Sequence, residues 1–244
     1  MPAPPGAAQE TLLGVSGIGF LALVLCLIAY RVVGAQLTAG LDEACAEAYF
    51  LAGQQFEATG NLDQAVLKYR QAMEGRFEDE TLRFMCGRAI GDLLFKQDQF
   101  EAAVSAYESL PPEAYDRAGA YTGYVTALWR AGNLDGAAAL GQTWLGLAES
   151  EGEKTQETWA RNVLMHIARS KGDAGIALAH GSRILELDPG SDAAIVVARI
   201  LIEQGDPDGA RARLETMLAH TESPARRQEG RALLAQLAAD TAQP

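Results

Sequence analysis

The sequence predicts an all-α protein in which helix pairs repeat behind one apolar N-terminal helix. Of its 244 residues, 48% are hydrophobic but only 7% are aromatic. This balance favours helices, because β-branched and aromatic residues pack best in sheets. The length suffices for one mid-sized domain with an appendage. Internal prolines stand at plausible helix junctions, where a missing N–H costs little. They are Pro111, Pro112, Pro189, Pro207 and Pro224.

The N-terminal segment contains the longest apolar run. From Leu12 to Tyr30 there are 19 residues without a charged side chain, which is the length of a helix that crosses a hydrocarbon core of about 30 Å. We therefore predict a transmembrane helix over residues 11–33, between a polar, Pro-rich tail (1–10) and a linker or helix extension (34–45). A cleaved signal peptide is the alternative, because Val33-Gly34-Ala35 resembles a cleavage site. The lack of Lys or Arg before the run favours a retained anchor.

The orientation of this anchor depends on a single residue. Arg31 is the only basic side chain near either end of the span, and the positive-inside rule then places the following domain in the cytoplasm. A periplasmic or extracytoplasmic domain stays open as the alternative, since N-terminal anchors of bacterial type also deliver domains across the membrane.

The charge argues against a nucleic-acid-binding protein, and the cysteine content argues against a disulfide-stabilised one. The net charge is −12, and residues 41–110 hold 13 acidic and 6 basic side chains. Such a surface repels phosphate backbones, so we do not expect nucleic acid as a partner. The three cysteines, Cys26, Cys45 and Cys86, form no CxxC pair and indicate no disulfide framework.

A short signature, a turn followed five residues on by alanine, returns five times. Glycine at the turn accepts the left-handed backbone that ends one helix, and the Asn or Asp after it caps the next. The alanine then lets two helices approach closely, and these alanines lie 38, 34, 40 and 33 residues apart. The copies run from Gly60 to Ala65, Asp98 to Ala103, Gly132 to Ala137, Gly172 to Ala177 and Gly205 to Ala210.

The sequence resembles the tetratricopeptide repeat (TPR) family, whose unit is a helix, a turn and a helix of about 34 residues. The first copy carries the resemblance best, with Tyr49, Gly53, Phe56, Ala65 and Tyr69 matching in type. Later copies depart from it, since Gly141 and Gly181 stand where an aromatic residue is expected and Val125 replaces the packing glycine. The resemblance implies a right-handed α-solenoid of about five helix pairs, over residues 46–79, 84–117, 118–151, 158–190 and 191–222, with a capping helix over 223–240.

The sequence offers no recognisable chemistry. His166, His180 and His220 are its only histidines, and none has the spacing of a metal-ligand motif. A GxSxG elbow, a Walker glycine loop and a dinucleotide fingerprint are all lacking. We therefore expect neither an enzyme nor a cofactor, a metal site or a small-molecule substrate.

By resemblance to the family, the first helix of each pair lines a concave face that binds proteins or peptides. Large apolar residues and arginines at outward positions of these helices are the side chains that anchor interfaces. The alternative for Trp129 and Trp159 is packing into the neighbouring repeat. A clamp for a partner's C-terminal carboxylate is not expected, because Phe50, Gln54, Ala89, Gly119 and Gly123 fill the matching places. The candidate partner-binding residues are Phe50, Arg88, Phe95, Trp129, Trp159, His166, Arg169 and Arg199.

Together these features predict a membrane-anchored scaffold or adaptor that binds partner proteins, for instance in assembling a membrane complex. Two alternatives remain. One is a structural accessory subunit held permanently in a larger membrane complex, and the other is an exported soluble binding protein that begins at Gln36 after signal cleavage.

Overall fold

The computed structural model describes residues 28, 31–33, 42–75 and 80–241, and these residues form helices and no strand. Residues 42–58 are helical. They are followed by α2 (Leu62–Glu74), α3 (Glu80–Lys96), α4 (Phe100–Glu108), the 3₁₀ helices η1 (Pro112–Tyr115) and η2 (Ala118–Ala120), α5 (Thr122–Arg130), α6 (Leu134–Glu151), α7 (Lys154–Lys171), α8 (Ala174–Leu187), α9 (Ala193–Glu203), α10 (Pro207–His220) and α11 (Pro224–Thr241).

The predicted transmembrane helix over residues 11–33 lies outside the described residues, apart from residues 28 and 31–33. Within the described ranges, no helix combines the length and the apolar character needed to cross a bilayer.

The chain divides into two compact units, residues 1–86 and 87–244, with the boundary inside α3. In the first unit, the helix over 42–58 packs against α2. Gly53 allows this contact, because a Cβ atom at this position would lie 2.7 Å from the ring of Tyr69. Phe50 lies on the same ring, with centroids 5.9 Å apart.

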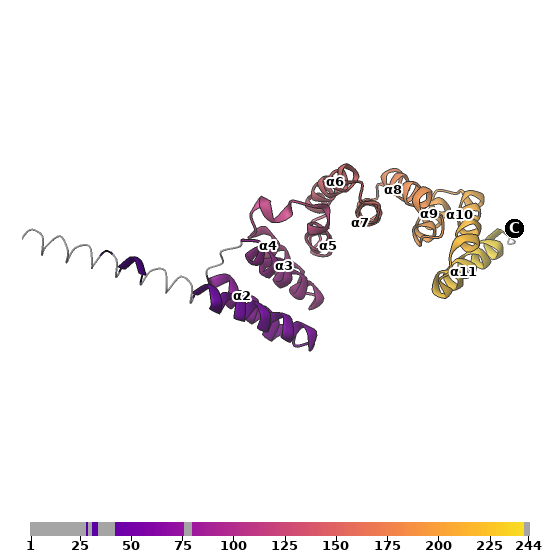
Figure 1. Cartoon of the computed structure of the whole chain (residues 1–244). Helices are drawn as coiled ribbons and strands as arrows, with labels where there is room; N and C mark the ends of the chain where they lie inside the picture. The colour runs from indigo at the N-terminus through magenta and orange to yellow at the C-terminus, as the bar shows by residue number, and fades with distance from the viewer. Residues whose placement is uncertain (1–27, 29–30, 34–41, 76–79, 242–244) are drawn as a thin grey trace, which may run out of the picture. The chain divides into compact units, whose positions relative to one another are not determined.

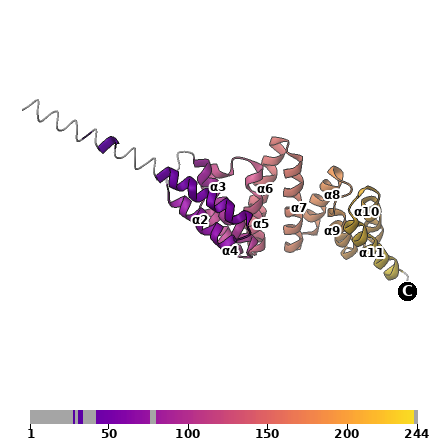
Figure 2. The same cartoon turned by 60° about the horizontal axis from the view of Figure 1, so that its bottom comes forward.

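In the second unit, each helix from α4 to α11 packs against the next one along the chain. Figures 1 and 2 show this succession of antiparallel neighbours from α5 to α11. Two apolar clusters form the core from α5 to α11. One lies among α5, α6 and α7 around Trp144 and Leu164, and the other lies among α7 to α11 around Ile184 and Met217.

The predicted turns share one backbone geometry. The residue at each turn has a positive φ, between 58° at Asp98 and 83° at Gly132. The following N–H donates to a carbonyl five residues back, as from Asn133 to Leu128 at 2.9 Å and from Asp173 to Ala168 at 2.9 Å. This is the Schellman arrangement that satisfies the last carbonyls of a helix. The signature in the sequence therefore corresponds to a helix end followed directly by a helix start.

The five signature alanines occupy equivalent places, since each is fully buried in the second helix of a pair. Each N–H donates to the carbonyl of the residue before its helix, over 3.0 Å from Ala137 to Asn133 and 3.2 Å from Ala210 to Asp206. Three cap side chains complete these helix starts, with Oδ1 atoms of Asn61, Asn133 and Asp206 accepting backbone N–H groups three residues on. The five alanines thus share one buried position in the first turn of a second helix.

Candidate functional site

The outward face of the first helices in residues 87–244 holds most of the predicted site residues. On α7, Trp159, His166 and Arg169 are spaced by seven and three residues, a spacing that places them on one side of a helix. Trp159 is exposed, with 51% of its surface accessible. Its predicted alternative, packing into the neighbouring repeat, therefore does not hold for this residue.

Trp129 packs against α7, as the alternative for this residue supposed. Its ring stacks on the imidazole of His166, with centroids 5.5 Å apart and planes 23° apart. The indole Nε1 donates to Ser170 Oγ over 3.4 Å. Trp129 is nevertheless only half-buried, so one part of the ring holds α5 to α7 and the rest contributes to the surface.

Burial and the nearby Arg169 lower the pKa of His166. Burial disfavours the imidazolium, and the guanidinium adds like-charge repulsion, while Asp192 opposes the shift. His166 therefore presents a neutral ring to Trp129 at physiological pH, which suits apolar or hydrogen-bonded contacts better than ionic ones.

Phe95 is half-buried and belongs to a local aromatic group. Its ring meets Phe100 edge-on at 5.4 Å. The guanidinium of Arg130 lies 4.4 Å from the Phe100 centroid and 5.9 Å from the Phe95 centroid. These cation–π contacts stabilise the α3–α4 turn, so Phe95 offers less free surface than its position suggests.

Arg88 is half-buried beside a cluster of tyrosines. Tyr107 stacks on Tyr124 at 5.5 Å, and Tyr115 lies 5.8 Å from Tyr124. The Tyr115 hydroxyl donates to the Tyr107 carbonyl over 2.7 Å, and the Tyr107 hydroxyl donates to Asp92. Burial raises the pKa of Tyr107, and the nearby Arg88 partly offsets this shift. Arg88 thus interacts electrostatically within the protein.

Phe50 corrects the prediction, because the structure buries this residue against Tyr69 instead of exposing it. Ile195, which holds the equivalent position in α9, is also buried. Both stand on a first helix, 15 residues before the signature alanine, where the helix faces its own pair. That position belongs to the core, not to a binding surface.

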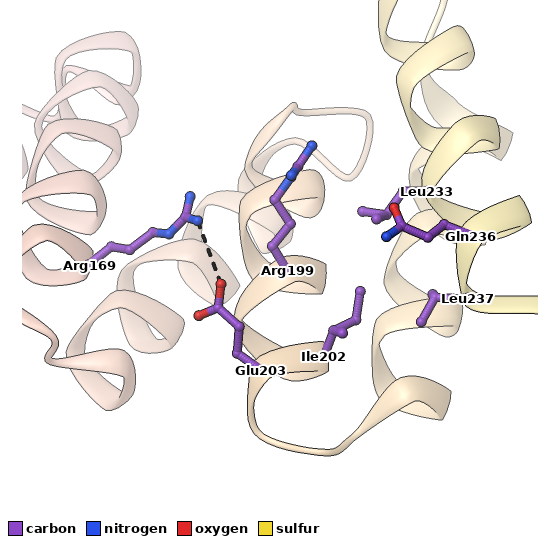
Figure 3. Close-up of a pocket in the computed structure, with 7 residues that line it drawn as sticks. All are labelled: Arg169, Arg199, Ile202, Glu203, Leu233, Gln236 and Leu237. Atoms are coloured by element: carbon purple, nitrogen blue, oxygen red, sulfur yellow. Dashed lines mark ion pairs between the residues drawn. The ribbon is translucent and has the colours of Figure 1, made fainter. Parts of the chain in front are cut away.

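A pocket of about 160 Å³ opens beside the remaining two predicted residues, Arg169 and Arg199. Arg169 Nη2 lies 3.7 Å from Glu203, and Arg199 Nη2 lies 3.3 Å from Glu229. Figure 3 shows both guanidinium groups at the rim, with α11 closing the opposite side. The complete lining consists of Arg169, Arg199, Ile202, Glu203, Leu233, Gln236 and Leu237.

Sequence reasoning missed the contribution of α11 to this pocket. It treated residues 223–240 only as a cap, although α11 packs on α10 as the first helix of a further pair would. A signal existed, because Leu233 and Gln236 stand 34 residues after Arg199 and Ile202, which is the length of one repeat. Extending the repeat by one period would have placed both residues at the site.

Among the residues that the structure describes, no group of three or more His, Cys, Asp and Glu side chains could hold a metal ion. The described surface offers aromatic rings, guanidinium groups and a small pocket lined by both apolar and polar side chains, which are features of surfaces that bind other proteins.

Comparison with models of known protein families identifies the type of repeat in the chain. Two models described as tetratricopeptide repeat match residues 88–152 and 168–237. A search of curated proteins found no match.

Similar solved structures are TPR proteins, and their identity to the chain is low enough that the likeness shows the fold alone. A tetratricopeptide repeat protein from Parabacteroides merdae is 17% identical, with a TM-score of 0.65 over 82% of this chain and 76% of its own. MamA is 17% identical, with a TM-score of 0.63 over 75% and 94%. YrrB, described as a TPR protein with an unusual peptide-binding site, is 17% identical, with a TM-score of 0.58 over 75% and 90%. The chain therefore contains tetratricopeptide repeats and folds as an all-helical, TPR-like solenoid.

Proposed function

We propose that this protein is a membrane-anchored scaffold that binds a segment of a partner protein through the outward face of α5, α7 and α9. One observation carries the proposal: the exposed Trp159 shares a helix side with His166 and Arg169, and Trp129 extends this surface onto α5. Exposed aromatic residues beside arginines are typical of interface anchors. YrrB, with its unusual peptide-binding site, is a precedent for peptide binding on this fold.

Site-specific cross-linking tests this proposal in intact cells. A photoreactive amino acid replaces Trp159 in one variant and Ile176 in another. Ile176 is a matched control, because it is similarly exposed, at 54% compared with 51%, but lies on α8, the second helix of its pair. We expect one discrete partner from position 159 and background from position 176, with Arg169→Ala reducing the yield several-fold. Equal yields from the two positions would contradict the proposal.

The anchor is proposed from the uncharged run between Leu12 and Tyr30. An arginine at the centre of a span costs about 2.5–3.5 kcal/mol on insertion, so Leu23→Arg should shift the protein from the carbonate-resistant membrane fraction to the supernatant. Retention of Leu23→Arg in the membrane, or a mature protein that begins at Gln36, would count against a retained helix.

Orientation is accessible through the cysteines. Cys45 is exposed, whereas burial raises the pKa of the Cys86 thiol to about 11, which leaves Cys86 a protonated and slow nucleophile at neutral pH. In a Cys26→Ser background, an impermeant maleimide should therefore report on Cys45. We expect no labelling of intact cells, since the proposal places the repeats in the cytoplasm. Rapid labelling would place them outside.

A further inference from the structure

We propose that the pocket between α9 and α11 binds one apolar side chain of the partner segment, and that Arg169 and Arg199 bind a carboxylate beside it. This inference rests on the proposed function and specifies its ligand chemistry. The partner segment would contain a leucine-sized or larger apolar residue next to Asp or Glu.

The shape of the pocket supports the apolar half of this proposal. Ile202, Leu233 and Leu237 form its apolar part, and the last two are almost fully buried, which fixes their positions. Its volume is about 160 Å³, and an apolar cavity of about 150 Å³ holds a benzene molecule. The pocket therefore has room for one leucine or phenylalanine side chain.

The charges at the rim support the acidic half. The lining contains two arginines and one glutamate, and Glu229 pairs with Arg199 just outside it, so each guanidinium already faces one exposed carboxylate that a ligand carboxylate could replace. The guanidinium groups come from two first helices, α7 and α9. In Figure 3 the Arg169 group points toward Glu203, and Arg199 lies between it and the α11 residues. A carboxylate at this place would accept paired N–H donors from a planar guanidinium.

The existing ion pairs leave both arginines available. Arg169 reaches Glu203 at 3.7 Å with side-chain exposures of 41% and 64%, and Arg199 reaches Glu229 at 3.3 Å with exposures of 47% and 54%. Solvent-exposed pairs of this kind contribute little to stability. A ligand carboxylate can therefore replace either glutamate at small cost, and Glu203 acts as a competitor that occupies the site when the ligand is absent.

Short fluorescein-labelled peptides test the proposal with the full-length chain. The probe is a Gly-Ser peptide with one central Leu-Glu pair, compared with Ala-Glu, Leu-Gln and Leu-Lys versions by fluorescence anisotropy. Loss of the leucine contact should weaken binding about tenfold or more, and Leu-Gln and Leu-Lys should bind several-fold more weakly than Leu-Glu. Equal affinity for all four peptides would overturn the proposal.

Variants of the protein separate competition from a structural role. Glu203→Gln should tighten binding of the Leu-Glu probe several-fold while leaving the Leu-Gln probe unchanged, because a competing carboxylate is removed. Arg199→Gln should weaken Leu-Glu alone. The matched control is Asp208→Asn, which breaks a similar exposed pair with Arg211 on α10 and should change neither affinity. If Glu203→Gln behaves like this control, the inference is wrong.

The two proposals fail separately. A partner that cross-links at position 159 but whose capture is insensitive to Arg199→Gln and Glu203→Gln supports the proposed function and overturns this inference. Probe binding that follows the Leu-Glu pattern without any partner at position 159 supports the pocket and counts against the wider surface.

Discussion

At the scale of single residues, the helix pairs are held by a small residue facing a large one. In two pairs the first helix supplies glycine and the second supplies tyrosine, as at Gly91 and Tyr107, where a Cβ would lie 2.5 Å from the ring. Two later pairs reverse the sizes. Met165 lies 3.1 Å from a Cβ built on Gly181, and Val125 lies 3.5 Å from one built on Gly141. The closest side chains to these two positions belong to the following helices, Val197 at 2.4 Å and Leu164 at 2.8 Å.

This reversal explains the departures from the family pattern in the third and fourth copies. The sequence showed Val125, Gly141 and Gly181 as exceptions, each judged alone. They become consistent once both members of a pair are compared, because a small residue then faces a larger one in each pair. Which helix supplies the small residue is therefore less predictable than the pairing of small with large.

Overpacking at one of these sites should be measurable. A Cβ at Gly181 would lie 2.4 Å from Val197 Cγ2, so Gly181→Ala should lower the free energy of unfolding by about 1–3 kcal/mol. Adding Val197→Ala removes the clashing methyl group and should make the double variant more stable than the sum of the single changes predicts. Urea unfolding provides the values.

Gly146→Ala is the matched control for this change. Gly146 is also a helical glycine, on α6, but a Cβ there would meet nothing within 4 Å. Since alanine favours helices over glycine by up to about 1 kcal/mol, Gly146→Ala should be neutral or stabilising. Equal losses at the two positions would indicate that propensity, not packing, explains both.

At the scale of elements, the turns were the most predictable feature. Each turn depends on a residue with positive φ, a capping side chain and a small residue in the first turn of the next helix. These residues lie within six positions, so the local sequence is sufficient to specify the turn. Pairwise contacts between helices were less accessible. Nothing near Trp129 in the sequence indicates that His166, 37 residues later, provides the ring on which it stacks.

The turn between α7 and α8 should be sensitive to substitution. Gly172 has a φ of 81° and open space at its Cβ position, so Gly172→Ala meets no clash but places a side chain in the left-handed region. We expect a loss of about 1 kcal/mol, the usual cost of a non-glycine residue in this conformation. The melting temperature should fall by a few degrees.

Gly175, three residues later, serves as the comparison. It lies inside α8 with no atom near its Cβ position, so Gly175→Ala should preserve or raise the melting temperature. A fall at both positions would mean that the left-handed backbone at Gly172 is not the cause.

At the scale of the whole molecule, stability should depend on two histidines. Burial and then nearby arginines lower the pKa of both, Arg169 acting on His166 and Arg161 on His180. His180 is only 8% exposed, and its Nδ1 lacks a hydrogen-bond partner among the described atoms. In the unfolded chain both return to a pKa of about 6.5.

The sign of the pH effect follows. Below about pH 6.5 the unfolded chain binds protons that the folded chain rejects, so stability should fall as pH decreases from 6.5 toward the lowered folded pKa values. Urea midpoints at pH 7.5 and 5.5 measure the fall. Replacing both histidines by glutamine should flatten this slope, whereas an unchanged slope would assign the effect to carboxylates.

The whole-chain prediction was strong for the fold and partial for the site. The repeat signature spans the chain and averages over five copies, so single errors did not alter the helical architecture. The site depends on outward register at individual positions, where Phe50 was misplaced by its contact with Tyr69. It also depends on α11, whose three pocket residues precede no signature alanine, unlike Arg169 and Arg199.

The opposite size order in neighbouring pairs has a consequence for chimeric proteins. The first or second helix of one pair cannot simply replace that of another pair. A hybrid pair of α3 with α6 would place Gly91 opposite Gly141 and leave a void. A hybrid pair of α5 with α4 would place Val125 opposite Tyr107, and these side chains would collide. Grafts should therefore cut between pairs, at junctions such as Glu153 or Ser191, and should retain Leu164 or Val197 in the following helix, because these side chains also contact Gly141 and Gly181.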